Sequence, residues 1–323
     1  MKILKLVLCS LLVVFLAFTP ARLVSGARAS FVDTRFVRST ERYNGTIVLY
    51  HVVRERPYVG SLSNWLAMRA EAYEKKHKGT YFLVEAMDEA EFMERIERGR
   101  PADAYSFFSG SLWEDRLAEL PDFRIPFRQG IFQTGKAIPY AYSGFVRLVK
   151  SSDRSGENVY TNHPVLAARA GAVQTVQSEE KAETLYLDLR RAGDLIRYRD
   201  AFSSAKMFPV DNVTEAVCWL GIDRNAEEKK KEVILDFMQY LLEPDVQPLL
   251  NVLGMMSVRR DVRNEPPDAS LKAVFKTYET VVTFDPFRWQ SEYDSLYEDA
   301  VLALKGDSDA GTRFTIRLQE LYR

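Results

Sequence analysis

The stretch from residue 44 to residue 108 alternates short apolar segments with amphipathic ones, and this pattern constrains the fold more than any other part of the chain. Segments 46–53 (TIVLYHVV), 80–86 (TYFLVEA) and 102–108 (ADAYSFF) are rich in β-branched and aromatic residues and predict strands. The segments between them carry apolar residues at helical spacing. Because crossovers between such strands are right-handed, the order strand–helix–strand–helix–strand predicts a parallel sheet covered by helices.

Polar and glycine residues mark the ends of these two helices. Ser61 or Ser63 is placed to cap the start of the first helix, and Gly79 to end it. Asp88 is the expected N-cap of the second helix, and Gly99 its end. The connections are therefore short. The ligand of such a sheet is expected at the carboxyl ends of its strands.

The rest of the chain continues the mixed α/β pattern with less regularity. The segment 217–223 (VCWLGID) predicts a buried strand, and a long helix follows it that stops at Pro244 and then resumes. Two stretches in the middle of the chain predict helices, as do two in the tail; their ranges are 160–176, 179–198, 291–305 and 309–322. The sequence contains no internal repeat and no low-complexity linker, so any second domain is expected to be interleaved with the first.

The first 29 residues have the pattern of a secretory signal peptide. Lys2 and Lys5 precede an apolar run, LVLCSLLVVFLAF, and Ala27 and Ala29 supply the small residues that a signal peptidase reads. We expect cleavage before Ser30 and a periplasmic or extracellular location. The alternative is that the run stays uncleaved as an N-terminal membrane anchor, although it is short for a membrane span.

Several classes of function find little support in the composition and the motifs. A net charge of -1 does not indicate a nucleic-acid binder. Cys218 is the one cysteine after the signal segment, and the three histidines, His51, His77 and His163, lie far apart, so no metal site is expected. The nucleotide-binding loops and the nucleophile elbow of hydrolases are absent from the sequence. The chain is therefore expected to have no cofactor and no enzymatic activity.

Aromatic residues gather where ligands of such a sheet would bind. Several lie in loops among Gly, Ser and Pro, as in SFFSGSLWED and FDPFRWQSEYD. Flat rings that line a cleft suit ligands with C–H faces, above all sugars, whereas core packing explains some of the same rings equally well.

Four segments, in their order and spacing, resemble the extracellular solute-binding proteins of ABC importers, in the group that includes the maltose-type sugar binders. They are the opening strand–helix–strand, ERGRPADAYSFF, GKAIPYAYSGFVRLVK, and the run from Val217 to Arg260, which is the most specific. Two features depart from the family pattern. Ala102 intervenes before Asp103 in the second segment, and a Thr-Trp-Asp segment is missing after the third, so the second lobe should be reduced.

The resemblance implies an α/β, type II periplasmic-binding-protein fold with two interleaved lobes and a ligand cleft between them. The first lobe would comprise 44–143 with 214–260, and the second 144–213 with 261–323. The chain would cross between the lobes near 142–145, 210–216 and 260. A small solute, expected to be a carbohydrate, would be captured by hinge closure and delivered to a membrane permease by a monomeric binder.

The site residues implied by this arrangement come from the ends of the first and third strands, from the first crossover and from the tail. They are His51, Arg54, Tyr58, Phe107, Phe108, Ser109, Trp113, Tyr142, Ser143 and Trp289. The rings would stack on the ligand, and the polar groups would form hydrogen bonds with it. Two alternatives stay open: the same fold with a polyamine, metal chelate or organic anion as ligand, and a secreted sensor or enzyme without a role in transport.

Overall fold

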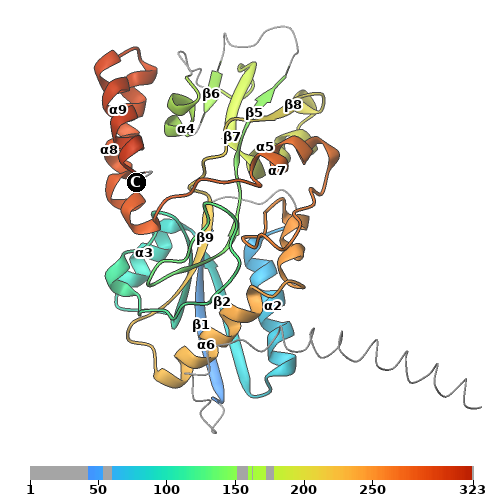
Figure 1. The fold of residues 1–323 in the computed structure, drawn as a ribbon, viewed down its shortest axis with the longest axis vertical. Helices are drawn as coiled ribbons and strands as arrows, with labels where there is room; N and C mark the ends of the chain where they lie inside the picture. The colour runs from blue at the N-terminus through green and yellow to red at the C-terminus, as the bar shows by residue number, and fades with distance from the viewer. Residues whose placement is uncertain (1–42, 54–59, 151–158, 162, 172–177, 322–323) are drawn as a thin grey trace, which may run out of the picture. The chain divides into compact units, whose positions relative to one another are not determined.

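The computed structural model describes residues 43–53, 60–150, 159–161, 163–171 and 178–321. Within these ranges the chain forms two β-sheets with helices packed against them (Figure 1). The predicted signal segment lies outside the described residues.

The first sheet has the strand order β2-β1-β3-β9-β4. Its strands are β1 (Gly45–Val52), β2 (Thr80–Met87), β3 (Ala104–Phe108), β4 (Ile138–Tyr142) and β9 (Val217–Ile222). β1 pairs in parallel with both β2 and β3, which confirms the parallel sheet predicted for the first three strands. β9 runs antiparallel to β3 and to β4, so the sheet as a whole is mixed. The amino end of β9 therefore lies at the same edge as the carboxyl end of β3.

Helices cover both faces of this sheet. α2 (Leu62–Lys76) and α6 (Glu228–Leu241) contact each other on one face, and α3 (Glu89–Glu97) contacts β1 on the other (Figure 1). The capping predictions are confirmed: the Ser61 hydroxyl accepts a hydrogen bond from the Asn64 amide, and the Asp88 carboxylate accepts one from the Glu91 amide. After Pro244 the chain resumes as a 3-10 helix; the four 3-10 segments described are η1 (Glu114–Arg116), η2 (Asp200–Phe202), η3 (Gln247–Leu253) and η4 (Ala269–Leu271).

The second sheet is smaller and has the strand order β6-β7-β5-β8. Its strands are β5 (Phe145–Val149), β6 (Val159–Thr161), β7 (Thr184–Asp188) and β8 (Lys206–Pro209), accompanied by the helices α4 (Pro164–Arg169), α5 (Leu189–Tyr198) and α7 (Lys272–Thr277). β5 pairs antiparallel with β7, and Phe145 at its start lies opposite Asp188 at the end of β7.

The two helices predicted for the middle of the chain, 160–176 and 179–198, are each wrong in part. The first half of 179–198 contains β7, whose five residues are all buried between β5 and β6. A strand buried on both faces has a continuous apolar pattern, and periodicity alone does not separate it from a buried helix. In the stretch 160–176, helix α4 covers six residues, and 172–176 lies outside the described residues.

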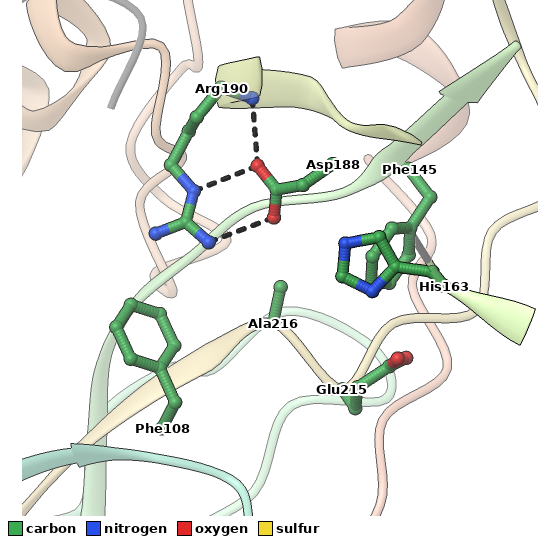
Figure 2. Close-up of a pocket in the computed structure, with 7 residues that line it drawn as sticks. All are labelled: Phe108, Phe145, His163, Asp188, Arg190, Glu215 and Ala216. Atoms are coloured by element: carbon green, nitrogen blue, oxygen red, sulfur yellow. Dashed lines mark hydrogen bonds and ion pairs between the residues drawn. The ribbon is translucent and has the colours of Figure 1, made fainter. Parts of the chain in front are cut away.

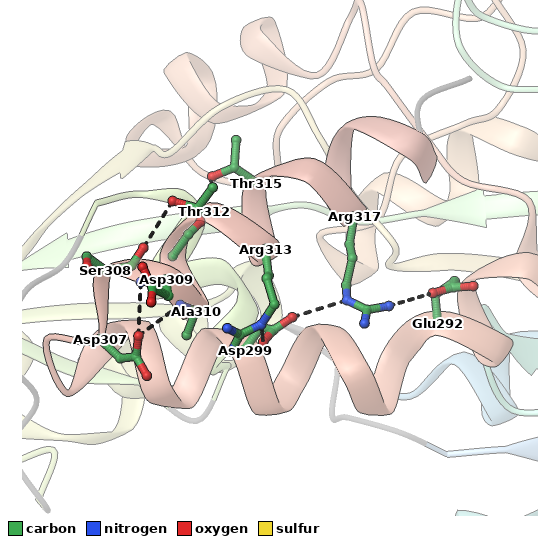
Figure 3. A network of polar contacts seen from close by, with 11 residues as sticks. Glu292, Asp299, Asp307, Ser308, Asp309, Ala310, Thr312, Arg313, Thr315 and Arg317 are labelled. Atoms are coloured by element: carbon green, nitrogen blue, oxygen red, sulfur yellow. Dashed lines mark hydrogen bonds and ion pairs between the residues drawn. The ribbon is translucent and has the colours of Figure 1, made fainter.

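The tail forms a helical hairpin of α8 (Pro286–Leu304) and α9 (Ser308–Leu321), which confirms the two predicted helices, although α8 begins five residues before 291. Figure 3 shows the ion pairs that join the two helices. The Asp299 carboxylate accepts hydrogen bonds from Arg313 Nε at 2.9 Å and from Arg317 Nε at 3.1 Å. The Asp307 carboxylate accepts hydrogen bonds from the first amides of α9.

The chain passes from the first sheet to the second between Tyr142 and Phe145 and returns between β8 and β9. These two passages are hydrogen-bonded to each other: the Ser143 amide donates to the Ala216 carbonyl at 2.8 Å, and the Thr214 hydroxyl donates to the Ser143 carbonyl at 2.9 Å. The exact extents of the two lobes stay a prediction.

Gly144, in the first passage, is required by a close approach of the Tyr278 ring. A Cβ atom at this position would lie 2.2 Å from the ring, well inside van der Waals contact. The Tyr278 hydroxyl accepts a hydrogen bond from the Phe145 amide at 2.8 Å, and the Tyr278 carbonyl accepts one from the Tyr142 hydroxyl at 2.8 Å. Tyr278 is thus hydrogen-bonded to the residues on both sides of the two-residue passage formed by Ser143 and Gly144.

Candidate functional site

A pocket lies between strand ends of the two sheets and the segments that connect the sheets (Figure 2). Phe108 ends β3 of the first sheet, Phe145 begins β5 of the second, and Asp188 ends β7. Its empty space is about 240 Å³, counting the part open to solvent. Its wall consists of Phe108, Phe145, His163, Asp188, Arg190, Glu215 and Ala216. Because its wall draws on both sheets, the pocket matches a site between two lobes.

A buried ion pair forms one side of the pocket. Arg190 Nε donates to Asp188 Oδ1 at 2.8 Å, and Arg190 Nη2 donates to Asp188 Oδ2 at 2.8 Å. Asp188 also caps α5 by accepting a hydrogen bond from the Arg190 amide at 2.7 Å. The guanidinium carbon lies 4.9 Å from the centre of the Phe108 ring. The bidentate geometry and the ring contact hold this cation in a fixed orientation.

A second charged cluster lies on the other side of Ala216, as Figure 2 shows for Glu215. Glu215 is 6% exposed, and its Oε2 has no hydrogen-bond partner among the described residues. Arg169 Nη1 lies 3.9 Å from this oxygen, too far for a hydrogen bond. The same guanidinium lies closer to Asp211, with Nε 2.7 Å from Oδ2. One cation is thus shared by two carboxylates.

His51, at the end of β1, belongs to a buried polar network behind the pocket. Its Nδ1 lies 2.8 Å from Ser106 Oγ, which lies 2.8 Å from the Tyr140 hydroxyl, and Cys218 Sγ donates to that hydroxyl at 3.0 Å. Burial, with a smaller contribution from the positive charge of Arg190, lowers the pKa of His51 to about 3. Burial raises the pKa of the Cys218 thiol to about 11. Both groups are therefore neutral at physiological pH, and the thiol is not a nucleophile.

The residues predicted at the end of the third strand have different surroundings. Phe108 lines the pocket, whereas Phe107 is buried with its ring 6.2 Å from that of Phe287. Ser109 is buried and accepts a hydrogen bond from Trp219 Nε1. Trp113 is 54% exposed and precedes η1. The predicted residues Arg54 and Tyr58 lie outside the described residues.

The residues predicted at the crossover and in the tail are buried. Ser143 has a buried hydroxyl without a hydrogen-bond partner among the described residues, and its backbone is bonded to pocket residue Ala216. Tyr142 packs in the interior, with its hydroxyl on the Tyr278 carbonyl. Trp289 is 1% exposed and stacks on Phe284 with ring centres 4.5 Å apart. Contacts of these residues with a ligand stay a prediction.

Four charged or polar residues of the pocket wall were missed by the sequence reasoning: Asp188, Arg190, Glu215 and His163. Asp188 is the last residue of the segment TLYLD and Arg190 lies two residues beyond it, whereas the sequence pattern predicts a helix there. As a strand, that segment would have placed both residues at a strand end, where ligands bind. Glu215 and His163 stand in connecting segments without a local pattern that distinguishes them from solvated loop residues.

Two features are absent from the described residues. No group of three or more His, Cys, Asp or Glu side chains that could hold a metal ion occurs among them. Within the same ranges, no helix combines the length and the apolar character needed to cross a membrane.

No protein-family model and no curated protein matches the sequence. Solved structures do match. The sugar-binding protein MalE of Xanthomonas citri has a TM-score of 0.61 at 11% identity, over 86% of this chain and 97% of that one. The maltodextrin-binding protein MalE1 of L. casei, without ligand, has a TM-score of 0.60 at 9% identity, over 87% and 98%. Iron-bound HitA of Pseudomonas aeruginosa has a TM-score of 0.55 at 14% identity, over 79% and 99%.

These likenesses extend over nearly the whole length of each solved chain, and at such low identity they establish the fold alone. The chain therefore has the type II periplasmic-binding-protein fold that the sequence resemblance implied.

Proposed function

We propose that the protein is the substrate-binding component of an ABC import system, and that it captures a small solute in the pocket between the two sheets. The observation that carries the proposal is the composition of the pocket wall: Phe108 comes from the first sheet, Phe145 and Asp188 from the second, and Glu215 and Ala216 from a passage between them. A ligand that touches all three parts is bound more tightly when they are close together, so its binding favours a closed form.

The hinge is proposed to consist of the hydrogen-bonded passages around Ser143 and Thr214. Short passages can absorb a rotation through a few backbone dihedrals, while the packed sheets move as rigid bodies. In this proposal the lobes comprise 44–143 with 214–260 and 144–213 with 261–323, and the closed, monomeric form docks on a permease. Export through the N-terminal signal, with the site of action outside the cytoplasm, belongs to the same proposal.

Carbohydrate is the solute class that the solved neighbours favour, because several of them are named for binding maltose or maltodextrin. A non-sugar solute is the second candidate. It is favoured by the charged side chains of the pocket wall, Asp188, Arg190 and Glu215, which exceed what hydrogen bonding to neutral hydroxyl groups requires.

The test is a thermal-shift screen of the protein without residues 1–29 against sugars, polyamines and organic anions, followed by calorimetric titration of each hit. A solute that binds the folded state alone raises the melting temperature. We expect Phe108→Leu to weaken binding of the hit by about tenfold, since it removes a ring contact worth about 1 kcal/mol or more. Phe208→Leu, which changes a half-exposed ring on β8 outside the pocket, serves as the matched control.

Two results would contradict the proposal. One is the absence of any stabilising solute in the screen. The other is chemical turnover of the solute by the purified protein, because turnover would identify an enzyme instead of a transport component.

A further inference from the structure

The carboxylate of Glu215 is a pocket group with unused hydrogen-bonding capacity. The side chain lines the pocket and is more than nine-tenths buried, yet Oε2 has no hydrogen-bond partner among the described residues. Buried carboxylate oxygens without a donor are rare in folded proteins, because desolvation of the charge is then not offset by any bond. Since the described residues supply no donor to this oxygen, it is available to a donor group of a bound solute.

The charges around Glu215 indicate what kind of donor fits. Asp188 and Arg190 form a bidentate pair whose two charges cancel. Arg169 lies between Asp211 and Glu215, and the shorter distance, 2.7 Å, is to Asp211. Two carboxylates and one guanidinium leave this cluster of described residues with one negative charge in excess.

A hydroxyl group of a neutral solute could donate a hydrogen bond to Glu215 but would leave that excess charge buried. An ammonium group supplies both the hydrogen bond and the compensating charge, and such charge-assisted bonds are the stronger kind.

We propose that the solute of this pocket carries a protonated amine that donates a hydrogen bond to Glu215 Oε2. The proposal rests on the proposed function, since it specifies the ligand of the same site. An amino sugar would satisfy both the carbohydrate expectation and the charge of the pocket.

The test compares amines with neutral analogues of the same shape on the protein without residues 1–29. The pairs are glucosamine with glucose, putrescine with butanediol, and aminobutyrate with hydroxybutyrate, each measured by thermal shift and by calorimetric titration. We expect at least one amine to bind, and its neutral analogue to bind at least tenfold more weakly.

Two variants locate the effect. Glu215→Gln keeps the size of the side chain and removes its charge, and it should weaken binding of that amine at least tenfold. Glu183→Gln is the matched control: this glutamate also has a buried Oε2 without a hydrogen-bond partner, but it precedes β7 at the end of the strand opposite to Asp188. It should leave the affinity unchanged.

The outcomes separate this inference from the proposed function. Binding of neutral analogues as tightly as amines, or wild-type affinity for the amine in the Glu215→Gln variant, would overturn the inference and leave solute capture intact. If neither the amines nor any neutral solute of the wider screen binds, both proposals are wrong. If Glu215→Gln folds poorly, the comparison of amines with their neutral analogues on the wild-type protein still tests the inference.

Discussion

Replacement of His51 by glutamine should remove a defined part of the acid sensitivity of the fold. In the folded protein, burial and the charge of Arg190 lower the pKa of His51 from 6.5 to about 3. In the unfolded chain the imidazole recovers its ordinary pKa of about 6.5. Between these two values unfolding takes up one proton, so the free energy of unfolding falls as the pH falls.

The size of this effect follows from the pKa difference. Each pH unit below 6.5 costs about 1.4 kcal/mol of stability until the folded-state pKa is approached. At pH 5 the wild-type protein should therefore have lost about 2 kcal/mol through His51, relative to pH 8. Glutamine does not titrate in this range, so the variant should lack this loss.

The assay is urea unfolding of wild type and His51→Gln at pH 8 and at pH 5. The difference in stability between the two proteins should change by about 2 kcal/mol in favour of the variant on acidification. Contributions from the other groups are common to both proteins and cancel in this comparison. An equal difference at both pH values would refute the account of a buried, neutral His51.

Three further substitutions test individual contacts that stabilise the fold. Gly144→Ala should destabilise the fold by about 1–3 kcal/mol in thermal unfolding, because its Cβ would lie 2.2 Å from the Tyr278 ring; wild-type stability would contradict the close approach. Trp289→Ala should cost about 3–5 kcal/mol, measured by urea unfolding, since the ring is buried against Phe284. Loss of ligand binding without loss of stability would instead place that ring in the site. Asp299→Asn should cost about 1 kcal/mol, and less at high salt, because its arginine partners are partly exposed; an effect insensitive to salt would contradict an electrostatic role.

Much of the first sheet could be predicted from the sequence because its signals are local. Each strand of the region 44–108 is bounded by a capped helix, as Ser61 and Asp88 illustrate, and short connections leave few alternative topologies. The segment TLYLD could not be assigned in this way. Its apolar residues face packed neighbours on both sides, which is a property of the tertiary structure and leaves no alternation in the sequence.

The candidate site could be predicted only where it belongs to the regular sheet. Phe108 was expected from its place at a strand end, and it lines the pocket. Glu215 lies in a connecting segment, and its role depends on residues far away in the chain, Arg169 and Asp188 among them. Contacts between residues so far apart in the chain leave no periodic pattern in the sequence. The buried positions of Tyr142 and Trp289 likewise follow from packing partners, Tyr278 and Phe284, that no local pattern identifies.

The central claim is that a small solute is held between two lobes that close on it, and X-ray scattering in solution tests it most directly. The radius of gyration of the protein without residues 1–29 is measured with and without a saturating concentration of the solute found in the screen, with calorimetry confirming that the solute is bound. The account predicts a smaller radius of gyration in the bound state. An unchanged radius, with the solute bound, would contradict closure of the lobes.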